Sequence, residues 1–158
     1  MLVQVADLDE KIAELDSDLR EQAREDEQAV RLMSIPGIGT LSAMAIQAFA
    51  PPMESFRCGR DFAAWLGLVP RQSSTGGKPK LGKISKMGQR DLRRLLITGA
   101  MATVSWAVRR GTKDPWLARM LARKPRMLVA VALANRMARI AWALMTKHEN
   151  YRAPQPTA

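Results

Sequence analysis

The chain has almost none of the residues that build disulfides or small catalytic centres. Its 158 residues include one cysteine, Cys58, and one histidine, His148. A single cysteine excludes an internal disulfide and is typical of a reducing compartment, so we expect Cys58 to be a small buried hydrophobe. His148 lies beside Lys147 and Glu149 near a polar C-terminus, and neither a metal site nor a catalytic dyad is predicted on it.

Long apolar runs and an apolar leader are also missing. No apolar run approaches the ~18 residues that a membrane span needs. The first ten residues, MLVQVADLDE, are acidic, whereas a signal peptide begins with basic residues. The sequence therefore predicts a cytoplasmic protein without a membrane partner.

Acids are scarce beyond residue 30. Residues 1–30 hold ten acids and three bases, whereas residues 31–158 hold five acids and twenty-two bases, a formal charge of +17 against +10 for the whole chain. A domain so basic is expected to bind a polyanion. The spacing of the five acids suggests no Mg²⁺ site, so no cofactor is predicted in this chain. They are Glu54, Asp61, Asp91, Asp114 and Glu149.

Apolar residues recur at spacings of three and four along nearly the whole chain, and most prolines and glycines lie between these segments. This pattern predicts an all-α helical bundle, with strand in under about a tenth of the residues. The length suits one compact domain with an extension. Helices are expected over residues 29–35, 41–50, 61–68 and 89–110, from Trp116, which follows the capping pair Asp114–Pro115, and from Pro125 onward.

The acidic N-terminal segment has the pattern of a coiled-coil arm. Val5, Leu8, Ile12, Leu15 and Leu19 alternate spacings of three and four, which places them in one a/d seam over two to three heptads. Such a seam needs a partner helix. The partner is either a second copy, which would make a homo-oligomer, or a segment folded back from the same chain.

Ile35–Ile46, with the sequence IPGIGTLSAMAI, has the form of a helix-hairpin-helix turn. Gly37 and Gly39 would expose backbone N–H groups at a helix N-terminus, where the helix dipole favours a DNA phosphate. A tight turn between two packed helices is the alternative interpretation of the same glycines.

The segment Pro70–Leu95, PRQSSTGGKPKLGKISKMGQRDLRRL, predicts a flexible basic loop. Cations can neutralise phosphates, glycines allow close backbone approach, and Ser73 or Ser74 supplies a hydroxyl that can attack phosphorus. Nucleic-acid clamping or phosphodiester chemistry is the functional interpretation, and a solvated linker is the alternative. The nucleic-acid-binding residues predicted here and in the turn are Gly37, Gly39, Arg71, Lys78, Lys80, Lys83, Lys86, Arg90, Arg93 and Arg94.

One known family resembles this chain in the order of its segments. An acidic helix comes first, followed by RLMSIPGIGTLSA, then by FAAWLGLVPRQSSTGGKPKLGKISKMGQRDLRRLLITGA, and last by a basic helical tail. It is similar to the C-terminal domain of the IS110/IS116/IS902 insertion-sequence transposases, over about Val30 to Ala143. The resemblance implies serine-dependent DNA recombination guided by a structured RNA. It also implies an N-terminal RNase H-like domain with four acids, which is absent here.

The resemblance assigns the nucleophile to Ser74, just before the Gly-rich turn. Attack on a phosphodiester would conserve the bond energy in a phosphoserine link, so strands can be resealed without ATP. Ser73 is a rival nucleophile and Ser85 a weaker one, which instead helps to start the following helix. Four cations are candidates to stabilise the negative charge that develops on the phosphate: Arg71, Lys78, Lys80 and Lys83.

In the resembled enzymes the metal-binding acids come from the missing domain, so Mg²⁺ is expected only when that domain is present. We divide the chain into a partial coiled-coil arm at residues 1–30, the transposase C-terminal domain at 31–150 and a disordered tail at 151–158. Two functions are compatible with these features. One is the truncated catalytic module of a DNA transposase, and the other is a non-catalytic DNA- or RNA-binding remnant or regulator.

Overall fold

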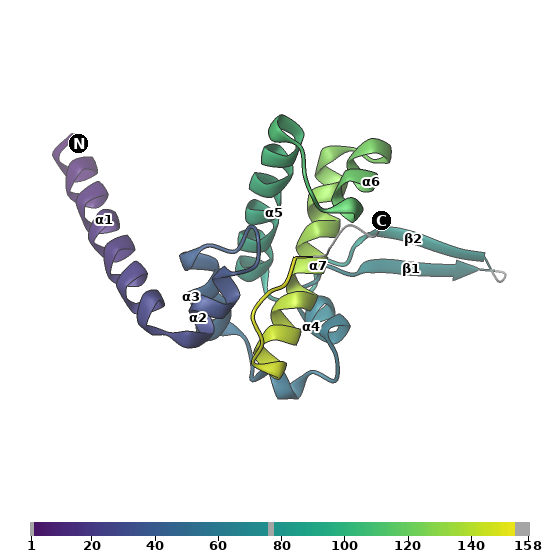
Figure 1. The fold of residues 1–158 in the computed structure, drawn as a ribbon, viewed down its shortest axis with the longest axis horizontal. Coiled ribbons are helices and arrows are strands. Elements are labelled where there is room, and N and C mark those ends of the chain that lie inside the picture. Colours follow the sequence, from purple (N-terminus) through teal and green to yellow (C-terminus); the bar gives the residue numbers. More distant parts are fainter. Residues whose placement is uncertain (1, 76–77, 154–158) are drawn as a thin grey trace.

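The computed structural model describes residues 2–75 and 78–153. Within these ranges it describes all side chains except those of residues 2–3, 73–75 and 78–80. Seven α-helices, one short 3-10 helix and one two-stranded sheet make up the described residues (Figure 1). They are α1 (Leu2–Glu25), α2 (Glu27–Met33), α3 (Thr40–Phe49), η1 (Met53–Ser55), α4 (Gly59–Trp65), β1 (Pro70–Thr75), β2 (Lys78–Ile84), α5 (Arg90–Arg110), α6 (Pro115–Arg123) and α7 (Arg126–Lys147).

The mostly helical fold confirms the predicted class, and the two strands, of six and seven residues, stay below a tenth of the chain. Helix boundaries also follow the capping signals. Asp114 Oδ1 accepts hydrogen bonds from the backbone N–H groups of Trp116 and Leu117 at 2.9 and 3.3 Å, and Pro115 occupies the first turn of α6. The last long helix begins directly after Pro125, as expected.

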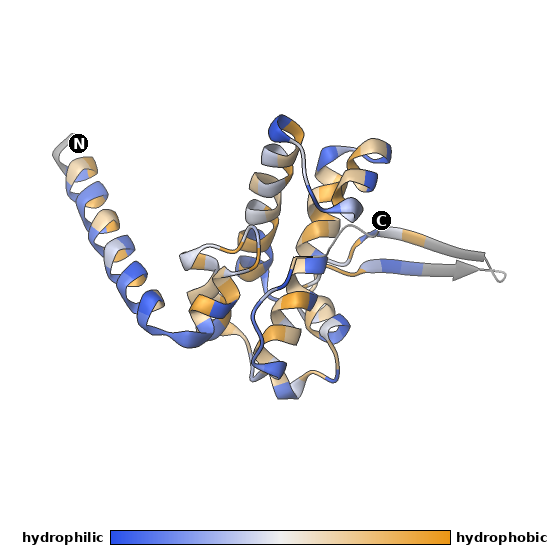
Figure 2. Cartoon of the chain, viewed as in Figure 1, coloured by the Kyte–Doolittle hydropathy of each residue, from blue (hydrophilic) through white to orange (hydrophobic). Residues whose placement is uncertain are grey.

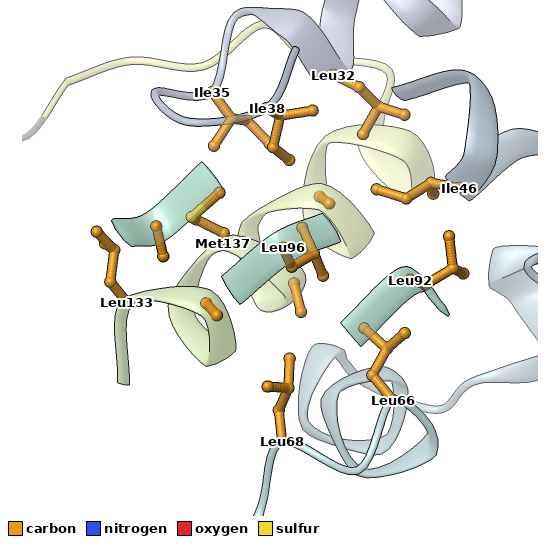
Figure 3. Close-up of a cluster of buried hydrophobic side chains, with 14 of the residues drawn as sticks. Leu32, Ile35, Ile38, Ile46, Leu66, Leu68, Leu92, Leu96, Leu133 and Met137 are labelled. Carbon is orange, nitrogen blue, oxygen red and sulfur yellow. The ribbon is translucent and has the colours of Figure 1, made fainter. Parts of the chain in front are cut away.

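The core is built on the pairing of α5 with α7, around which α2, α3 and α4 pack. Small buried residues on α7 allow neighbouring backbones to approach closely; they are Ala130, Ala134, Ala138 and Ala141. Leu96 of α5 and Met137 of α7 lie at the centre. Figure 3 shows side chains from α2 and α3 and the α2–α3 turn on one side of this pair, and Leu66 and Leu68 on the other.

Helix α7 is long and apolar enough to cross a membrane, by length and composition only. The sequence analysis did not identify this helix as a long apolar segment, because Arg136 and Arg139 interrupt its apolar residues. In the fold it is the central helix of the core. Its Val129, Ala134 and Ala138 have no exposed surface.

The turn between α2 and α3 packs directly against α5. Gly37 has a φ of +92°, and a Cβ atom added there would lie 2.7 Å from Thr103 Oγ1 and 2.8 Å from the Gly99 carbonyl oxygen. A Cβ atom added to Gly99 would lie 1.9 Å from the Gly37 carbonyl oxygen. Two glycines in contact therefore set how closely the turn approaches α5.

Helix α1 extends away from the helical body as a single arm (Figure 1), and hydrophilic residues alternate with apolar ones along it (Figure 2). The seam residues Val5, Leu8, Ile12 and Leu15 are 53–63% exposed, so the arm is not folded back along the described part of its own chain. Only the C-terminal end of α1 packs on the body, where Ala23 is buried.

The arm joins the body through the N-cap of α2. Asp26 Oδ1 accepts hydrogen bonds from the Ala29 backbone N–H and from Gln47 Nε2, both at 2.8 Å. These bonds, the one from Ala29 first, hold the pKa of Asp26 below its ordinary value. The carboxylate therefore ties the start of α2 to α3 at the root of the arm.

The prediction that Pro70–Leu95 is a loop was wrong for its first half. Strands β1 and β2 pair antiparallel, with Pro70 opposite Ile84, Gln72 opposite Leu81 and an irregularity between Pro70 and Gln72. The two strands contain only two β-branched residues, Thr75 and Ile84, and no aromatic residue, whereas both kinds are typical of strands. Both strands are edge strands, so Pro79 is tolerated in β2, and the backbone pairing is local.

We predict that the Gly37–Gly99 contact is required for stability. Gly37→Ala should lower the free energy of unfolding by about 1–3 kcal/mol through the strained φ alone, and the steric overlap adds to this loss. Gly99→Ala should also destabilise, because its Cβ atom meets backbone that cannot easily move. Gly39→Ala is the control: its φ is −94° and nothing lies within 4 Å of an added Cβ atom. Urea unfolding should show a change of no more than about 1 kcal/mol for this control, and equal losses for all three variants would contradict the prediction.

Candidate nucleic-acid interface

The hairpin β1–β2 projects from the helical body, on the side away from the arm (Figure 1). Its root is held by backbone hydrogen bonds from Ser85 N–H to the Val69 carbonyl at 2.9 Å and from Lys86 N–H to the Gly67 carbonyl at 3.2 Å. Gly88 closes the return to α5 with a φ of +111°, and a Cβ atom there would lie 1.8 Å from the Trp65 carbonyl oxygen. Only glycine fits this position.

Side chains from the two central helices also fasten the root. Arg93 Nη1 of α5 donates to the Leu66 carbonyl at 3.0 Å, and Asn135 Nδ2 of α7 donates to the Leu68 carbonyl at 3.1 Å. Both carbonyls belong to the segment that leads from α4 into β1. The direction of the hairpin is therefore set by the α5–α7 core.

The predicted nucleophiles lie on β1, near the far end of the hairpin. In the strand register Ser73 is opposite Lys80, and Ser74 is opposite Pro79. Their side chains, and those of Lys78 and Lys80, lie outside the described residues, so their predicted roles stay predictions. Ser85 lies at the opposite end, at the root, where its Oγ accepts a hydrogen bond from the Met87 N–H at 3.4 Å. It does not cap α5, whose N-cap is Gln89.

Five of the predicted cations are exposed around the hairpin and the start of α5: Arg71, Lys83, Lys86, Arg90 and Arg94. Within the described part of the chain, none of them forms an ion pair. Arg71 Nη2 donates to the Ser85 carbonyl at 3.2 Å, which ties β1 to the root of the hairpin. Arg93 differs from this group because its guanidinium is half-buried against the Leu66 carbonyl.

The two glycines of the turn have different surroundings. Gly37 is packed against α5, which fits the alternative of a tight turn between packed helices. Gly39 is exposed at the N-terminus of α3, whose first turn carries no acid and no side-chain cap. Phosphate binding at this helix end stays a prediction, and Gly39 is the glycine that leaves space for it.

The acids beyond the arm are dispersed, and two are engaged by arginines. Asp61 lies 3.6 Å from Arg57, and Asp114 Oδ2 lies 2.8 Å from Arg136 Nη1. Among the described residues, no group of three or more histidines, cysteines, aspartates or glutamates could hold a metal ion. The described side chains near the hairpin thus supply cations and do not group carboxylates.

Sequence reasoning missed one buried charge and misplaced the cysteine. Arg31 is 7% exposed, pairs with Glu27 at 2.5 Å, and its Nη1 lies 3.2 Å from Nδ1 of His148, which ends α7. His148 therefore has a structural contact across the fold. No spacing in the sequence predicts the Arg31–His148 contact, because its partners are 117 positions apart.

The expectation that Cys58 is buried was wrong. Cys58 is half-buried at the N-cap of α4.

A cavity of about 220 Å³ lies between the α2–α3 turn, the start of α6 and α7. The Asp114–Arg136 ion pair lines it, together with Tyr151 and apolar residues such as Leu133. Burial raises the pKa of Tyr151, Arg136 opposes this shift and Asp114 adds to it. The Tyr151 backbone N–H donates to Ser34 Oγ at 3.2 Å, so the C-terminal segment closes over this part of the core.

Comparison with known families gives the class of this chain, the transposases of insertion sequences. The family described as "Transposase IS116/IS110/IS902 family" matches residues 29–116, which is more than half of the chain, so the chain belongs to this family.

Curated relatives agree along most of the chain. It is 48% identical over 146 residues to the "Probable family 20 transposase" of Pseudomonas aeruginosa, covering 92% of this chain and 43% of that protein. It is 42% identical over 139 residues to the "Transposase for insertion sequence element IS1328" of Yersinia enterocolitica, covering 87% and 42%. It is 40% identical over 145 residues to the "Transposase for insertion sequence element IS1111A" of Coxiella burnetii, covering 91% and 40%. The chain thus spans about two-fifths of the length of these relatives.

We predict that the neighbouring residues Arg93 and Arg94 differ sharply in their effect on stability. Arg93→Ala removes a charged donor from the Leu66 carbonyl and should lower the free energy of unfolding by about 1.5–3 kcal/mol. Arg94→Ala, at an exposed position of the same helix, should change it by less than about 0.5 kcal/mol. Thermal and urea unfolding of the two variants measure this difference. Equal stabilities would show that the hydrogen bond does not secure the hairpin root.

Proposed function

We propose that this chain is the serine-bearing, DNA-binding part of an insertion-sequence transposase. The observation that carries the proposal is the projecting basic hairpin, with Ser74 on β1 and a root fixed to the core. A two-stranded ribbon of this kind can approach DNA while the helical body stays outside the groove. Membership of the transposase family and the +17 charge of residues 31–158 support DNA as the substrate.

The proposed chemical step is an exchange of phosphoester bonds. The Ser74 Oγ–phosphorus bond forms as the bond between phosphorus and a DNA sugar oxygen breaks. The serine proton passes to a base, and the departing sugar oxygen takes up a proton. The phosphoserine link keeps the energy of the broken ester, so a second sugar hydroxyl can reverse the step on another strand. Cations beside the hairpin would stabilise the charge that develops on the phosphate oxygens.

The site on this chain would need carboxylates from elsewhere. The acids that are positioned by Arg57 and Arg136 lie outside the hairpin, and the described residues group no metal ligands. We infer that Mg²⁺ is held by an RNase H-like domain, as the resemblance implies, and that a structured RNA guides the choice of DNA. The whole transposition reaction would then require both parts.

A non-catalytic role as a DNA- or RNA-binding regulator is the second candidate. The same absence of grouped metal ligands among the described residues favours it over activity of this chain alone. Binding to nucleic acid is common to both candidates, so covalent attachment is the property that separates them.

We predict that Ser74 forms the covalent link, and only with help. The chain by itself should bind duplex DNA and form no adduct. With the RNase H-like domain of a relative, Mg²⁺ and guide RNA, a protein–DNA adduct should survive denaturing electrophoresis. Ser74→Ala should abolish the adduct and leave DNA affinity within about twofold, because it removes the nucleophile and no charge.

The matched controls are Ser73→Ala and Ser85→Ala, which should retain the adduct. Peptide mapping of the adduct identifies the attached residue. An adduct on Ser73, or one that persists in Ser74→Ala, would refute the assignment. No adduct under any condition, with normal DNA binding, would favour the regulator.

We also propose that the arm pairs with the arm of a second copy. Its four seam residues are exposed to water in the single chain, and burying them together would favour association. Sedimentation should show a dimer or larger species, and Leu8→Asp with Leu15→Asp should release monomers. Ala6→Asp with Ala13→Asp adds the same charge at exposed positions outside the seam and should leave the oligomer intact. A monomeric parent chain would contradict this proposal.

A further inference from the structure

A second basic surface lies at the end of the helical body farthest from the start of α5. It is formed by the C-terminal turn of α5, the exposed side of α6 and the start of α7 (Figure 1). We call it the distal basic end. All seven of its cations are exposed: Arg109, Arg110, Lys113, Arg119, Arg123, Lys124 and Arg126.

The distal basic end has almost no internal neutralisation. Between Leu92 and His148 the sequence contains twelve bases and a single acid, Asp114. That carboxylate already caps α6 and lies 2.8 Å from Arg136, a residue outside the set of seven. None of the seven forms an ion pair within the described part of the chain. So dense a positive surface has the charge complementary to a polyanion.

Trp106 distinguishes this surface from a merely charged one. It is 60% exposed, whereas the other three tryptophans, Trp65, Trp116 and Trp142, are half-buried. The Trp142 indole N–H donates to the Met53 carbonyl, and Trp65 stacks on Phe62. The guanidinium carbon of Arg110 lies 4.4 Å from the centre of the Trp106 ring. An exposed indole beside an arginine is the combination on which unpaired bases stack in single-strand-binding proteins.

We propose that the distal basic end binds an unpaired stretch of nucleic acid. A base would stack on Trp106 with help from Arg110, and the phosphates would lie along the cations of α6 and α7. This inference rests on the proposed function, because it takes the chain to be a nucleic-acid-handling protein. In a duplex both faces of each base are stacked, so Trp106 would add little there. Single-stranded DNA and RNA offer the same chemistry.

The distal basic end is separate from the hairpin root along α5. Trp106 follows Arg90 by sixteen positions in the same helix, which corresponds to about 24 Å at 1.5 Å per residue. A strand held at the distal basic end can therefore be distinct from the duplex that we assign to the hairpin. The two surfaces would let one chain hold a paired and an unpaired segment at the same time.

The test compares binding of the intact chain to three labelled probes by fluorescence anisotropy: twelve-nucleotide oligo-dT, oligo-U of the same length and a twenty-base-pair duplex. Trp106→Ala should weaken binding to oligo-dT, oligo-U or both by roughly 5- to 150-fold, the range for loss of one base stack. Duplex binding should change by less than about threefold. Trp106→Tyr should restore most of the single-strand affinity, whereas Trp106→Leu should not, because only the tyrosine keeps an aromatic face.

Phe49→Ala is the matched control. Phe49 is an aromatic residue of similar exposure, 61%, on α3, a helix without charged residues. It should leave all three affinities unchanged. Unchanged single-strand affinity in Trp106→Ala, or an equal loss on the duplex, would overturn the inference and leave the hairpin proposal intact. A parent chain that binds none of the three probes would instead overturn the proposed function.

Discussion

The close packing of α5 on α7 is the contact on which the other functional features depend. Small residues such as Ala100 on α5 and Ala134 on α7 are fully buried, which allows the two backbones to approach. From this pair, Gly99 receives the α2–α3 turn, while Arg93 and Asn135 hold the segment that enters the hairpin. A change that separates the two helices would therefore displace the turn and the hairpin together.

The distribution of charge follows the same architecture. The acidic residues are concentrated on an arm that leaves the body, and the body itself is basic on the hairpin, α6 and the start of α7. Separating the two signs in space prevents the arm from neutralising the surfaces proposed to bind phosphate. Among the acids of the body, Asp114 has a structural role, because it caps α6 and forms an ion pair with Arg136.

The proposed chemistry requires two parts of a longer transposase, each of which supplies different catalytic groups. This chain supplies a serine and cations on a ribbon that is anchored at one end. In the proposed reaction this arrangement would capture a phosphodiester and attach to it covalently, whereas metal activation requires carboxylates in a group. The coverage of about two-fifths of the curated relatives leaves room for such a second part in those proteins.

The sequence alone determined the features that depend on local periodicity, capping and composition. Apolar spacing predicted the helices, Asp114–Pro115 predicted the start of α6, and the family motifs predicted the family. These are short-range signals, because a cap or a helical stripe is defined within a few residues. The charge asymmetry belongs with them, because it requires only a count of acids and bases on either side of residue 30.

The tertiary structure decided the strand pairing, the burial of individual side chains and the partners that they contact. It paired Pro70–Thr75 with Lys78–Ile84, where weak strand propensity had predicted a loop. It placed Arg93 within hydrogen-bond distance of the Leu66 carbonyl and left Arg94 exposed, although the two arginines are adjacent in the sequence. It also packed Gly37 against Gly99 and left Trp106 beside Arg110 at the surface. Burial and partner choice depend on which helix lies opposite, and residue spacing along one chain does not carry that information.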